Sequence, residues 1–312
     1  IVTGSAESLV LCENPTDAER GPEAGVQNIC STARQAIRES GLDFKQIRGV
    51  GLATPGTMDL KRGMLLEPPN LPGWVNVPIR QQVEDELGIQ TVLQNDANAA
   101  AYGEFWAGAG SEAHSLVFWT LGTGVGCGII IGDLILTGEH SHGAECGHII
   151  IEMDNGRRCN TGQYGTLEAY ASATALVQRC REALDSGRQT ELTRMLDAGE
   201  ELTALLISEA AEQGDSLANE LVMETARYLG VGTTTLMHTI DPDMVLIGGA
   251  MTFGRDEKEL GRRFLERIQQ EVRQRAFPVP ARETVIDFAT LGGDAGYIGA
   301  AGCARLAFRK AD

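Results

Sequence analysis

The stretch Leu121-Gly122-Thr123-Gly124-Val125-Gly126-Cys127-Gly128 runs directly into Ile129-Ile130-Ile131. Alternate glycines leave backbone N–H groups uncovered, so a phosphate can approach them closely. The other interpretation is a twisted hairpin in which glycine only relieves crowding. Because a strand-like run follows, and no helix, the stretch is not the Gly-x-Gly-x-x-Gly dinucleotide fingerprint. The sequence also lacks the Gly-x-x-x-x-Gly-Lys-Ser/Thr loop, so nicotinamide dehydrogenases and P-loop enzymes are both disfavoured.

Strand and helix patterns alternate on the N-terminal side of this stretch. Periodicity and turn residues predict helices over 22–39, 77–87 and 97–107, and strands over 46–53 and 90–93. This alternation favours an α/β layer with a largely parallel sheet. The pattern changes beyond residue 110, so we place a domain boundary there. We expect two closely packed halves with a cleft between them.

The C-terminal part carries short strands first and long helices afterwards. Strands are expected over 115–120, 128–131, 134–136, 148–152, 244–247 and 285–289. Helices are expected over 167–186, 190–196, 201–213, 216–240, 257–276 and 295–308. Asp241-Pro242 should end the longest of these helices, because proline cannot continue it.

Composition excludes several classes of function. The chain of 312 residues has 26 basic and 43 acidic side chains, and its net charge of −17 repels nucleic acid and anionic membranes. A small phosphorylated ligand that arrives with a divalent cation stays possible. The most apolar stretch, 120–137, contains Asp133 and several glycines, so we expect no membrane span. We also expect no secretory signal, and the seven scattered cysteines favour a cytoplasmic protein.

Further candidates are polar residues near the ends of predicted elements. Asn95-Asp96 lies between a strand and a helix, where open α/β sheets place ligand-contacting groups, although Asp96 would equally serve as a helix cap. Glu145 and Glu168 either accept hydrogen bonds from vicinal sugar hydroxyls or are solvated surface charges. His148, in an apolar stretch, is either a core histidine or a ligand. Taken singly, these residues leave the choice open.

Taken together, these motifs resemble the ROK family of sugar kinases, open reading frames and repressors, and within it the glucokinase branch. Five segments carry the resemblance in the expected order: Gly51-Leu52-Ala53-Thr54-Pro55-Gly56, Asn70-Leu71-Pro72-Gly73-Trp74, Asn95-Asp96-Ala97-Asn98-Ala99-Ala100 with Gly103-Glu104, the stretch 121–128, and Gly143 to His148 with Leu167-Glu168-Ala169-Tyr170-Ala171-Ser172. Leu246-Ile247-Gly248-Gly249-Ala250 and the segment 294–301 are similar as well. The resemblance covers nearly the whole chain.

The resemblance implies a two-domain, actin-like ATPase fold of the ribonuclease H-like type, with a sugar in the interdomain cleft. A small α/β domain would cover 1–110, joined by the closing helix 296–312. A large α/β domain over 111–295 would hold the nucleotide. ATP with Mg²⁺ is the implied cofactor.

The resemblance also implies a role for each matching residue. Asp96 would be the general base that takes the proton from the sugar hydroxyl. The sugar would be held by Gly56, Asn70, Asn95, Glu145, His148 and Glu168. The phosphates would lie against Gly122, Thr123 and Gly124, and the adenosine against Gly248, Gly249 and Ala250.

One departure from the family pattern concerns the first phosphate loop. Family members open with a strand bearing Asp-x-Gly-Gly-Thr, and residues 1–20 contain no match. Ile1-Val2-Thr3 resembles the end of the second strand of that hairpin, and Ser8-Leu9-Val10-Leu11 resembles the third. We therefore expect the loop to precede residue 1 in the native protein. A natural truncation is the alternative.

A second departure concerns zinc. The family's zinc loop reads Cys-x-Cys-Gly-x-x-Gly-Cys-x-Glu and works with an upstream His. In the corresponding run Cys159–Glu168, two of the three cysteine positions are threonine. His148 and Cys159 would supply only two of the four N/S ligands of a structural zinc site. A rearranged site with Cys146, His140 and His142 is conceivable, but we expect no metal.

The resemblance therefore implies a glucokinase-like enzyme of carbohydrate metabolism and glycolysis, which uses ATP to phosphorylate glucose at its 6-hydroxyl. The alternatives are a kinase for N-acetylmannosamine, N-acetylglucosamine, fructose or allose, and a non-catalytic sugar sensor of the repressor type. The sensor is disfavoured because the sequence shows neither a helix-turn-helix nor a basic face. Family members are commonly dimers or tetramers, so a homo-oligomer is expected.

Overall fold

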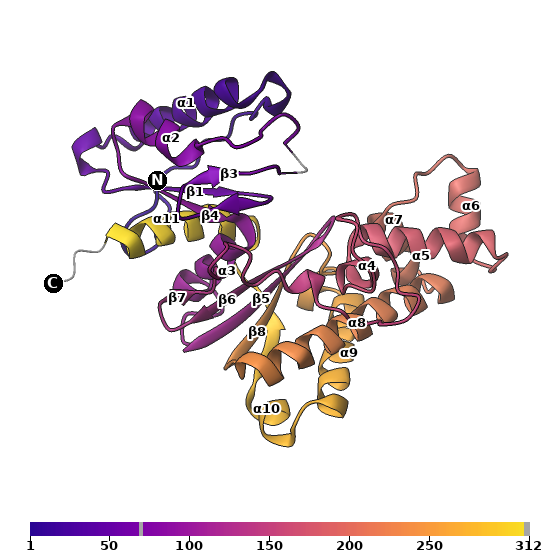
Figure 1. Cartoon of the computed structure of the whole chain (residues 1–312). Coiled ribbons are helices and arrows are strands. Elements are labelled where there is room, and N and C mark those ends of the chain that lie inside the picture. Colours follow the sequence, from indigo (N-terminus) through magenta and orange to yellow (C-terminus); the bar gives the residue numbers. More distant parts are fainter. Residues whose placement is uncertain (69–70, 309–312) are drawn as a thin grey trace. The chain divides into compact units, whose positions relative to one another are not determined.

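The structure, a computed structural model, describes residues 1–68 and 71–308 (Figure 1). It divides into two compact units. The first unit comprises 1–112, 128–144 and 291–312, and the second comprises 113–127 and 145–290. The domains that the sequence predicted, with a boundary near residue 110, stay a prediction. The cleft expected between the two halves stays a prediction.

The first unit is built around two parallel strands, β1 (Val50–Thr54) and β4 (Thr91–Asn95). Helices α1 (Pro22–Ser40) and α2 (Ile79–Leu87) pack against each other, and their apolar faces join β1 and β4 in one core (Figure 1). The core also holds Trp74, whose indole Nε1 donates a hydrogen bond to the Ala18 carbonyl at 3.0 Å. The unit also contains η1 (Ala18–Arg20), η2 (Phe44–Gln46) and the hairpin of β2 (Met58–Asp59) with β3 (Met64–Leu65).

Two helices far apart in sequence pack against each other in the first unit. These are α3 (Asp96–Ala107) and the closing helix α11 (Ala295–Phe308), which follows η5 (Gly292–Asp294) and also contacts β1 and β4. A Cβ at Gly299 would overlap the carbonyl oxygen of Ala99, so only glycine permits this close approach. α11 therefore holds α3, which begins at Asp96, in a defined position.

The hairpin of the segment 128–144 also packs closely on α3 at a glycine. It contains the second half of β6 (Val125–Ile131), which pairs antiparallel with β7 (Leu134–Ile135). A Cβ at Gly128 would overlap the Cβ of Ala101 in α3, so glycine lets the strand lie directly on that helix. This contact joins the segment to the first unit.

The second unit contains the parallel strands β5 (Ser115–Leu121), β8 (Met244–Gly249) and β9 (Val285–Phe288), and the first half of β6. The strand order is β7-β6-β5-β8-β9, so the sheet is mixed. β5 is almost entirely buried, and the indole of Trp119 donates to Thr233 Oγ1 at 3.1 Å. The fold is thus α/β with a mixed sheet.

Helices account for most of the rest of the second unit. They are η3 (Cys146–His148), α4 (Glu168–Ala171), α5 (Ala173–Asp185), α6 (Glu191–Asp197), α7 (Ala204–Glu212), α8 (Ser216–Ile240), η4 (Arg255–Glu257), α9 (Glu259–Arg275) and α10 (Pro278–Glu283). α8 packs against α9, α7 and α5, and α9 packs against β9.

Three sequence-based assignments differ from the structure. The strand expected over 148–152 is wrong, because η3 occupies its start and, within the part of the chain that the structure describes, the rest forms only the isolated bridge of Ile150 with Thr166. The helix expected over 167–186 is interrupted at Ser172, whose side chain caps α5 by accepting the N–H of Ala175. The sequence reading also missed α10, whose first turn contains proline.

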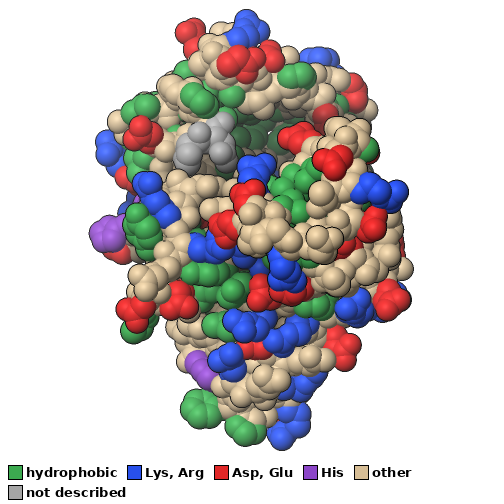
Figure 2. Space-filling model, turned by 90° about the vertical axis from the view of Figure 1, so that its right-hand side faces the viewer, with side chains coloured by type: hydrophobic (Ala, Val, Ile, Leu, Met, Phe, Trp, Pro, Cys, Tyr) green, Lys and Arg blue, Asp and Glu red, His purple; other side chains and the backbone are tan. Residues whose placement is uncertain are grey.

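The surface carries charges of both signs. Acidic and basic side chains lie interspersed on the face drawn in Figure 2. Some form exposed ion pairs, such as Arg34 with Glu86 and Arg188 with Glu220. Among the described residues, no helix is both long enough and apolar enough to cross a bilayer.

Candidate functional site

The junction of β4 and α3 carries the first candidate residues, Asn95 and Asp96. Asn95 has extended backbone geometry, and its side-chain oxygen accepts the N–H groups of Ala97 at 2.9 Å and Asn98 at 3.2 Å. Asn95 is therefore the helix cap. Asp96 Oδ1 also accepts the N–H of Ala97 at 2.9 Å, but this bond duplicates one that the cap already makes. The Asp96 carboxylate is not required to begin the helix.

Asp96 combines accessibility with a perturbed pKa. Its side chain is exposed, yet enough protein surrounds it that desolvation raises the pKa of the carboxyl above its ordinary value. Backbone hydrogen bonds from Ala97 and from Asp96 itself act in the opposite direction and are weaker. An accessible carboxylate with a raised pKa is suited to accept a proton.

The end of β1 lies beside this carboxylate. β1 and β4 are parallel, and Thr54 is in register with Asn95, so the loop after β1 follows at the same edge as Asp96. Gly56 in that loop has φ 88°, and a Cβ there would overlap Pro68. The hydroxyl of Thr54 is buried without a hydrogen-bond partner among the described residues. Asn70, the other candidate on this side, lies outside the described residues.

The glycine stretch forms a turn between β5 and β6 in the second unit. The N–H of Gly122 donates to the carbonyl of Gly124 at 3.0 Å, and nothing lies within 4 Å of a Cβ built at Gly122. α5 supports the turn, because Ala173 N–H donates to Gly122 O at 2.9 Å and Thr174 Oγ1 donates to Thr123 O at 2.9 Å. The turn is therefore open on one side and held on the other, as a phosphate-binding loop must be.

The turn after β8 lies next to the glycine stretch. β5 and β8 are parallel with Leu121 opposite Gly249, and Met251 N–H donates to Leu121 O at 3.1 Å. Gly249 and Ala250 are exposed, whereas Gly248 is buried against Phe118. Gly122–Gly124 and Gly249–Ala250 thus meet at the carboxyl ends of parallel strands, where α/β sheets bind ligands. Gly248 is buried one residue before this edge, within β8.

Glu168 connects the sugar candidates to the glycine turn. Its carboxylate Oε2 accepts the N–H of Val125 at 3.0 Å, and it lies so close to Gly124 that a Cβ there would overlap it. Glu168 is half-buried as the first residue of α4. Oε2 therefore fixes Val125 at the end of the turn. Among the described residues Oε1 has no hydrogen-bond partner, so it can bind a ligand.

Glu145 precedes the short helix η3, and His148 is its last residue. Glu145 is exposed, and its carbonyl accepts the N–H of His148 at 3.0 Å. The Nδ1 atom of His148 is buried without a hydrogen-bond partner among the described residues. The structure thus brings His148 and Glu168 together, because their ligand atoms and that of Cys159 lie within 4.8 Å of one another.

This cluster does not match a structural zinc site. Such a site has four N or S ligands, and among the described residues the cluster offers only His148 and Cys159 of those types. The thiol of Cys159 donates to Gln163 Oε1 at 3.4 Å and contacts Thr161 Oγ1 at 3.0 Å, so it is engaged in hydrogen bonds. Of the two histidines considered for a rearranged site, His142 contacts the His140 carbonyl instead, at 2.6 Å.

Glu104 is a positioning residue that the sequence reading quoted only as part of a motif. It is fully buried in α3, where its Oε1 accepts the N–H of Leu291 at 2.7 Å and its Oε2 accepts the N–H of Ala109 at 3.1 Å. It therefore ties the helix that begins at Asp96 to the segment before α11. The signal in the sequence was an acidic residue within a predicted helix. Once such a residue is buried, it is almost always paired.

The α/β fold with its mixed sheet matches solved ROK kinase structures, which have the actin-like ATPase fold. The model of the ROK family matches residues 2–306, and the chain belongs to this family. It is 32% identical over 298 residues to the glucokinase of Halalkalibacterium halodurans, covering 96% of this chain and 88% of that protein. It is also 32% identical over 252 residues to a putative xylose repressor of Caldicellulosiruptor sp., covering 81% of this chain and 61% of the repressor.

A solved structure supports the same assignment. The chain is similar to a ROK family glucokinase from Streptomyces griseus in complex with glucose and AMPPNP, with a TM-score of 0.73 and 36% identity. The match covers 91% of this chain and 88% of the other.

Proposed function

We propose that this chain is an ATP-dependent hexose kinase that phosphorylates glucose at its 6-hydroxyl. The observation that carries the proposal is Asp96, whose carboxylate is accessible, has a raised pKa and is relieved of helix capping by Asn95. A protein that only bound sugar would need no such base. Similarity to glucokinases, one of them solved with glucose and AMPPNP, supports the choice of substrates.

In the proposed reaction, Asp96 accepts the proton of the sugar hydroxyl as its oxygen forms a bond to the terminal phosphorus of ATP. ADP then leaves with the electrons of the broken P–O bond. General-base catalysis of this kind contributes roughly 10²- to 10⁴-fold in rate. The hydroxyl is oriented by side chains and backbone groups that we assign to sugar binding: Gly56, Asn70, Asn95, Glu145, His148 and Glu168.

The nucleotide is assigned to the second unit. The turn Gly122, Thr123 and Gly124 would receive the phosphates, with the amides of Thr123 and Gly124 as donors, because the N–H of Gly122 already donates to the Gly124 carbonyl. Gly248, Gly249 and Ala250 would lie along the adenosine. Mg²⁺ bound to ATP neutralises phosphate charge and so favours transfer. The turn offers backbone amides and no carboxylate, so we assign none of its residues to the ion.

A coupled assay of ADP release over a panel of hexoses and N-acetylhexosamines tests the proposal. We expect the highest kcat/KM with glucose. A higher kcat/KM with N-acetylmannosamine, N-acetylglucosamine, fructose or allose would support a kinase with that sugar as its substrate. Absence of ADP release with every sugar would refute the kinase.

A sugar sensor is the second candidate function, and the similarity to a putative xylose repressor favours it. Titration calorimetry separates the two functions. A sensor binds its sugar without releasing ADP, whereas a kinase turns it over when ATP is added.

A further inference from the structure

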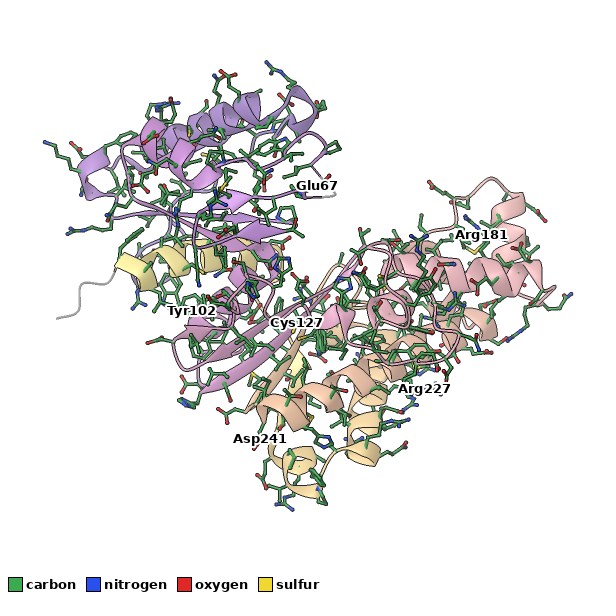
Figure 3. All side chains as sticks on the ribbon, viewed as in Figure 1. Glu67, Tyr102, Cys127, Arg181, Arg227 and Asp241 are labelled. Atoms are coloured by element: carbon green, nitrogen blue, oxygen red, sulfur yellow. The ribbon has the colours of Figure 1, made fainter. Side chains whose placement is uncertain are left out.

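Two of the seven cysteines meet beside the proposed sugar-binding residues Glu145 and His148. Cys127, labelled in Figure 3, lies on β6, and Cys146 is the first residue of η3. Both side chains are buried, with 5% and 8% of their surface exposed. The thiol of Cys127 donates a hydrogen bond to the sulfur of Cys146.

Backbone packing holds the two cysteines together. Val125 and Cys127 point to the same face of β6, because side chains alternate along a strand. Gly147, the neighbour of Cys146, lies so close to β6 that a Cβ there would overlap the carbonyl oxygen of Val125. The short helix is therefore pressed against the strand that carries Cys127. The contact of the two thiols follows from this packing.

The pair also occupies a special place along the chain. The chain leaves the second unit after Cys127 and re-enters it at Glu145, with the segment 128–144 in between. A disulfide from Cys127 to Cys146 would close a ring of roughly 20 residues. It would tie the short helix, with Glu145 before it and His148 at its end, to the strand.

The surroundings give the two thiols different reactivity. Burial raises the pKa of the Cys127 thiol well above its ordinary value. The hydrogen bond from Cys127 lowers the pKa of the Cys146 thiol. The thiolate is the attacking species, so we assign the first attack to Cys146 and the second to Cys127.

We propose that Cys127 and Cys146 form a reversible dithiol–disulfide pair, closed by a peroxide, and that closing the pair weakens sugar binding. In the first step the Cys146 sulfur attacks a peroxide oxygen, the O–O bond breaks, and a sulfenic acid and water form. In the second step the Cys127 sulfur attacks the Cys146 sulfur, the S–O bond breaks, and a disulfide and a second water form. The two thiols lose two electrons and the peroxide gains them; a dithiol reductant reverses the change.

Cross-linking by hydrogen peroxide tests the pair. The reduced chain is treated with peroxide, quenched with an alkylating reagent, digested and examined by mass spectrometry. We expect a peptide cross-linked between Cys127 and Cys146 that dithiothreitol abolishes. The matched control Cys180→Ser, which removes a thiol whose pKa burial raises to about 11, should keep the cross-link.

The variant Cys127→Ser should trap the sulfenic acid at Cys146, which dimedone labels. If this variant does not fold, the wild-type cross-link decides the question alone. Peroxide-treated wild-type protein that remains folded with both thiols free to alkylate would overturn the pair.

The weakening of sugar binding rests on the proposed function. It is measured separately from the formation of the disulfide. Titration calorimetry should show glucose affinity at least about fivefold weaker in the cross-linked protein. The affinity of Cys146→Ser should not respond to peroxide. An unchanged affinity in cross-linked protein overturns the link to sugar binding. If the reduced protein binds no hexose, the proposed function and that link fail together, while mass spectrometry still decides whether the disulfide forms.

Discussion

The start of α3 in the first unit and the start of α4 in the second each carry a carboxylate, but the two carboxylates serve the fold differently. Asn95 accepts the N–H groups that open α3, so Asp96 repeats a bond that is already made. Glu168 accepts the N–H of Val125 and so helps α5 to hold the glycine turn. The comparison teaches that Asp96 can be changed without damage to the fold, whereas Glu168 cannot.

The largest expected effect comes from Asp96→Asn. The amide keeps the shape but cannot accept the proton, so kcat should fall by roughly 10²- to 10⁴-fold while the glucose Kd changes little. The thermal midpoint should stay the same or rise slightly, because desolvation disfavours the ionised carboxylate. ADP-release kinetics, calorimetry and thermal melts measure these quantities. Asp133→Asn, at an exposed turn, is the control, and near-normal kcat in Asp96→Asn would remove Asp96 from the role of base.

Glu168→Gln should alter both binding and stability. We expect KM for glucose to rise about tenfold, from the loss of one charge-assisted hydrogen bond to the sugar. The free energy of unfolding should fall by about 1 kcal/mol, because the N–H of Val125 then meets a neutral acceptor. Chemical denaturation and steady-state kinetics give the two values. Glu200→Gln, an exposed residue, should change neither; an unchanged KM in Glu168→Gln would exclude it from the sugar site.

Asn95→Ala tests whether the Asn95 cap is what frees Asp96 from capping α3. Loss of the cap should lower the free energy of unfolding by about 1 kcal/mol. Turnover should fall as well, since the first turn of α3 positions Asp96. Thr203→Ala, which removes the cap of α7 in the second unit, should lose similar stability and keep turnover. If the two variants lose turnover equally, the effect of Asn95 is only one of stability.

The pH dependence of kcat/KM sharpens the assignment of the base. Asp96 must be ionised to accept a proton, and desolvation raises the pKa of its carboxyl. Activity should therefore decline on acidification at a pH above the ordinary range of aspartic acid, around 3.9. Steady-state kinetics across acid pH measure this decline, with a parallel melt to exclude unfolding. A profile flat down to the ordinary pKa would contradict the role.

Metal removal should have the smallest effect. The cluster of His148, Cys159 and Glu168 lacks the ligands of a structural zinc site, and hydrogen bonds from Cys159 to Thr161 and Gln163 hold the loop. A chelator should leave the thermal midpoint unchanged. Elemental analysis of protein purified without chelator should find no zinc, and one zinc per chain would show this prediction to be wrong.

Sequence reasoning succeeded where local signals agreed. α8 was placed over 216–240 because the helical pattern runs that far and Asp241-Pro242 follows its end, and the structure agrees, with Asp215 capping its start. It failed over 148–152, where an apolar pattern typical of a strand has only the bridge to Thr166 as pairing. Whether this segment forms a strand depends on a pairing segment many residues away, and a short stretch of sequence does not contain that segment.

The candidate site shows the same division. The motifs pointed to Asp96 and Glu168, but a polar pair before a helix fits either a cap or a base. Only the observed bonds of Asn95 showed that the neighbouring residue takes the cap.

By itself, the sequence determined the family, the periodic helices, the glycine turn and the identity of the carboxylates, because these depend on neighbouring residues. The tertiary structure decided which carboxylate the fold needs, that 128–144 packs on α3, and that Cys127 meets Cys146. Those outcomes depend on contacts between distant segments, such as Glu168 with Val125. Such contacts form only when whole elements pack, and no local pattern encodes their geometry.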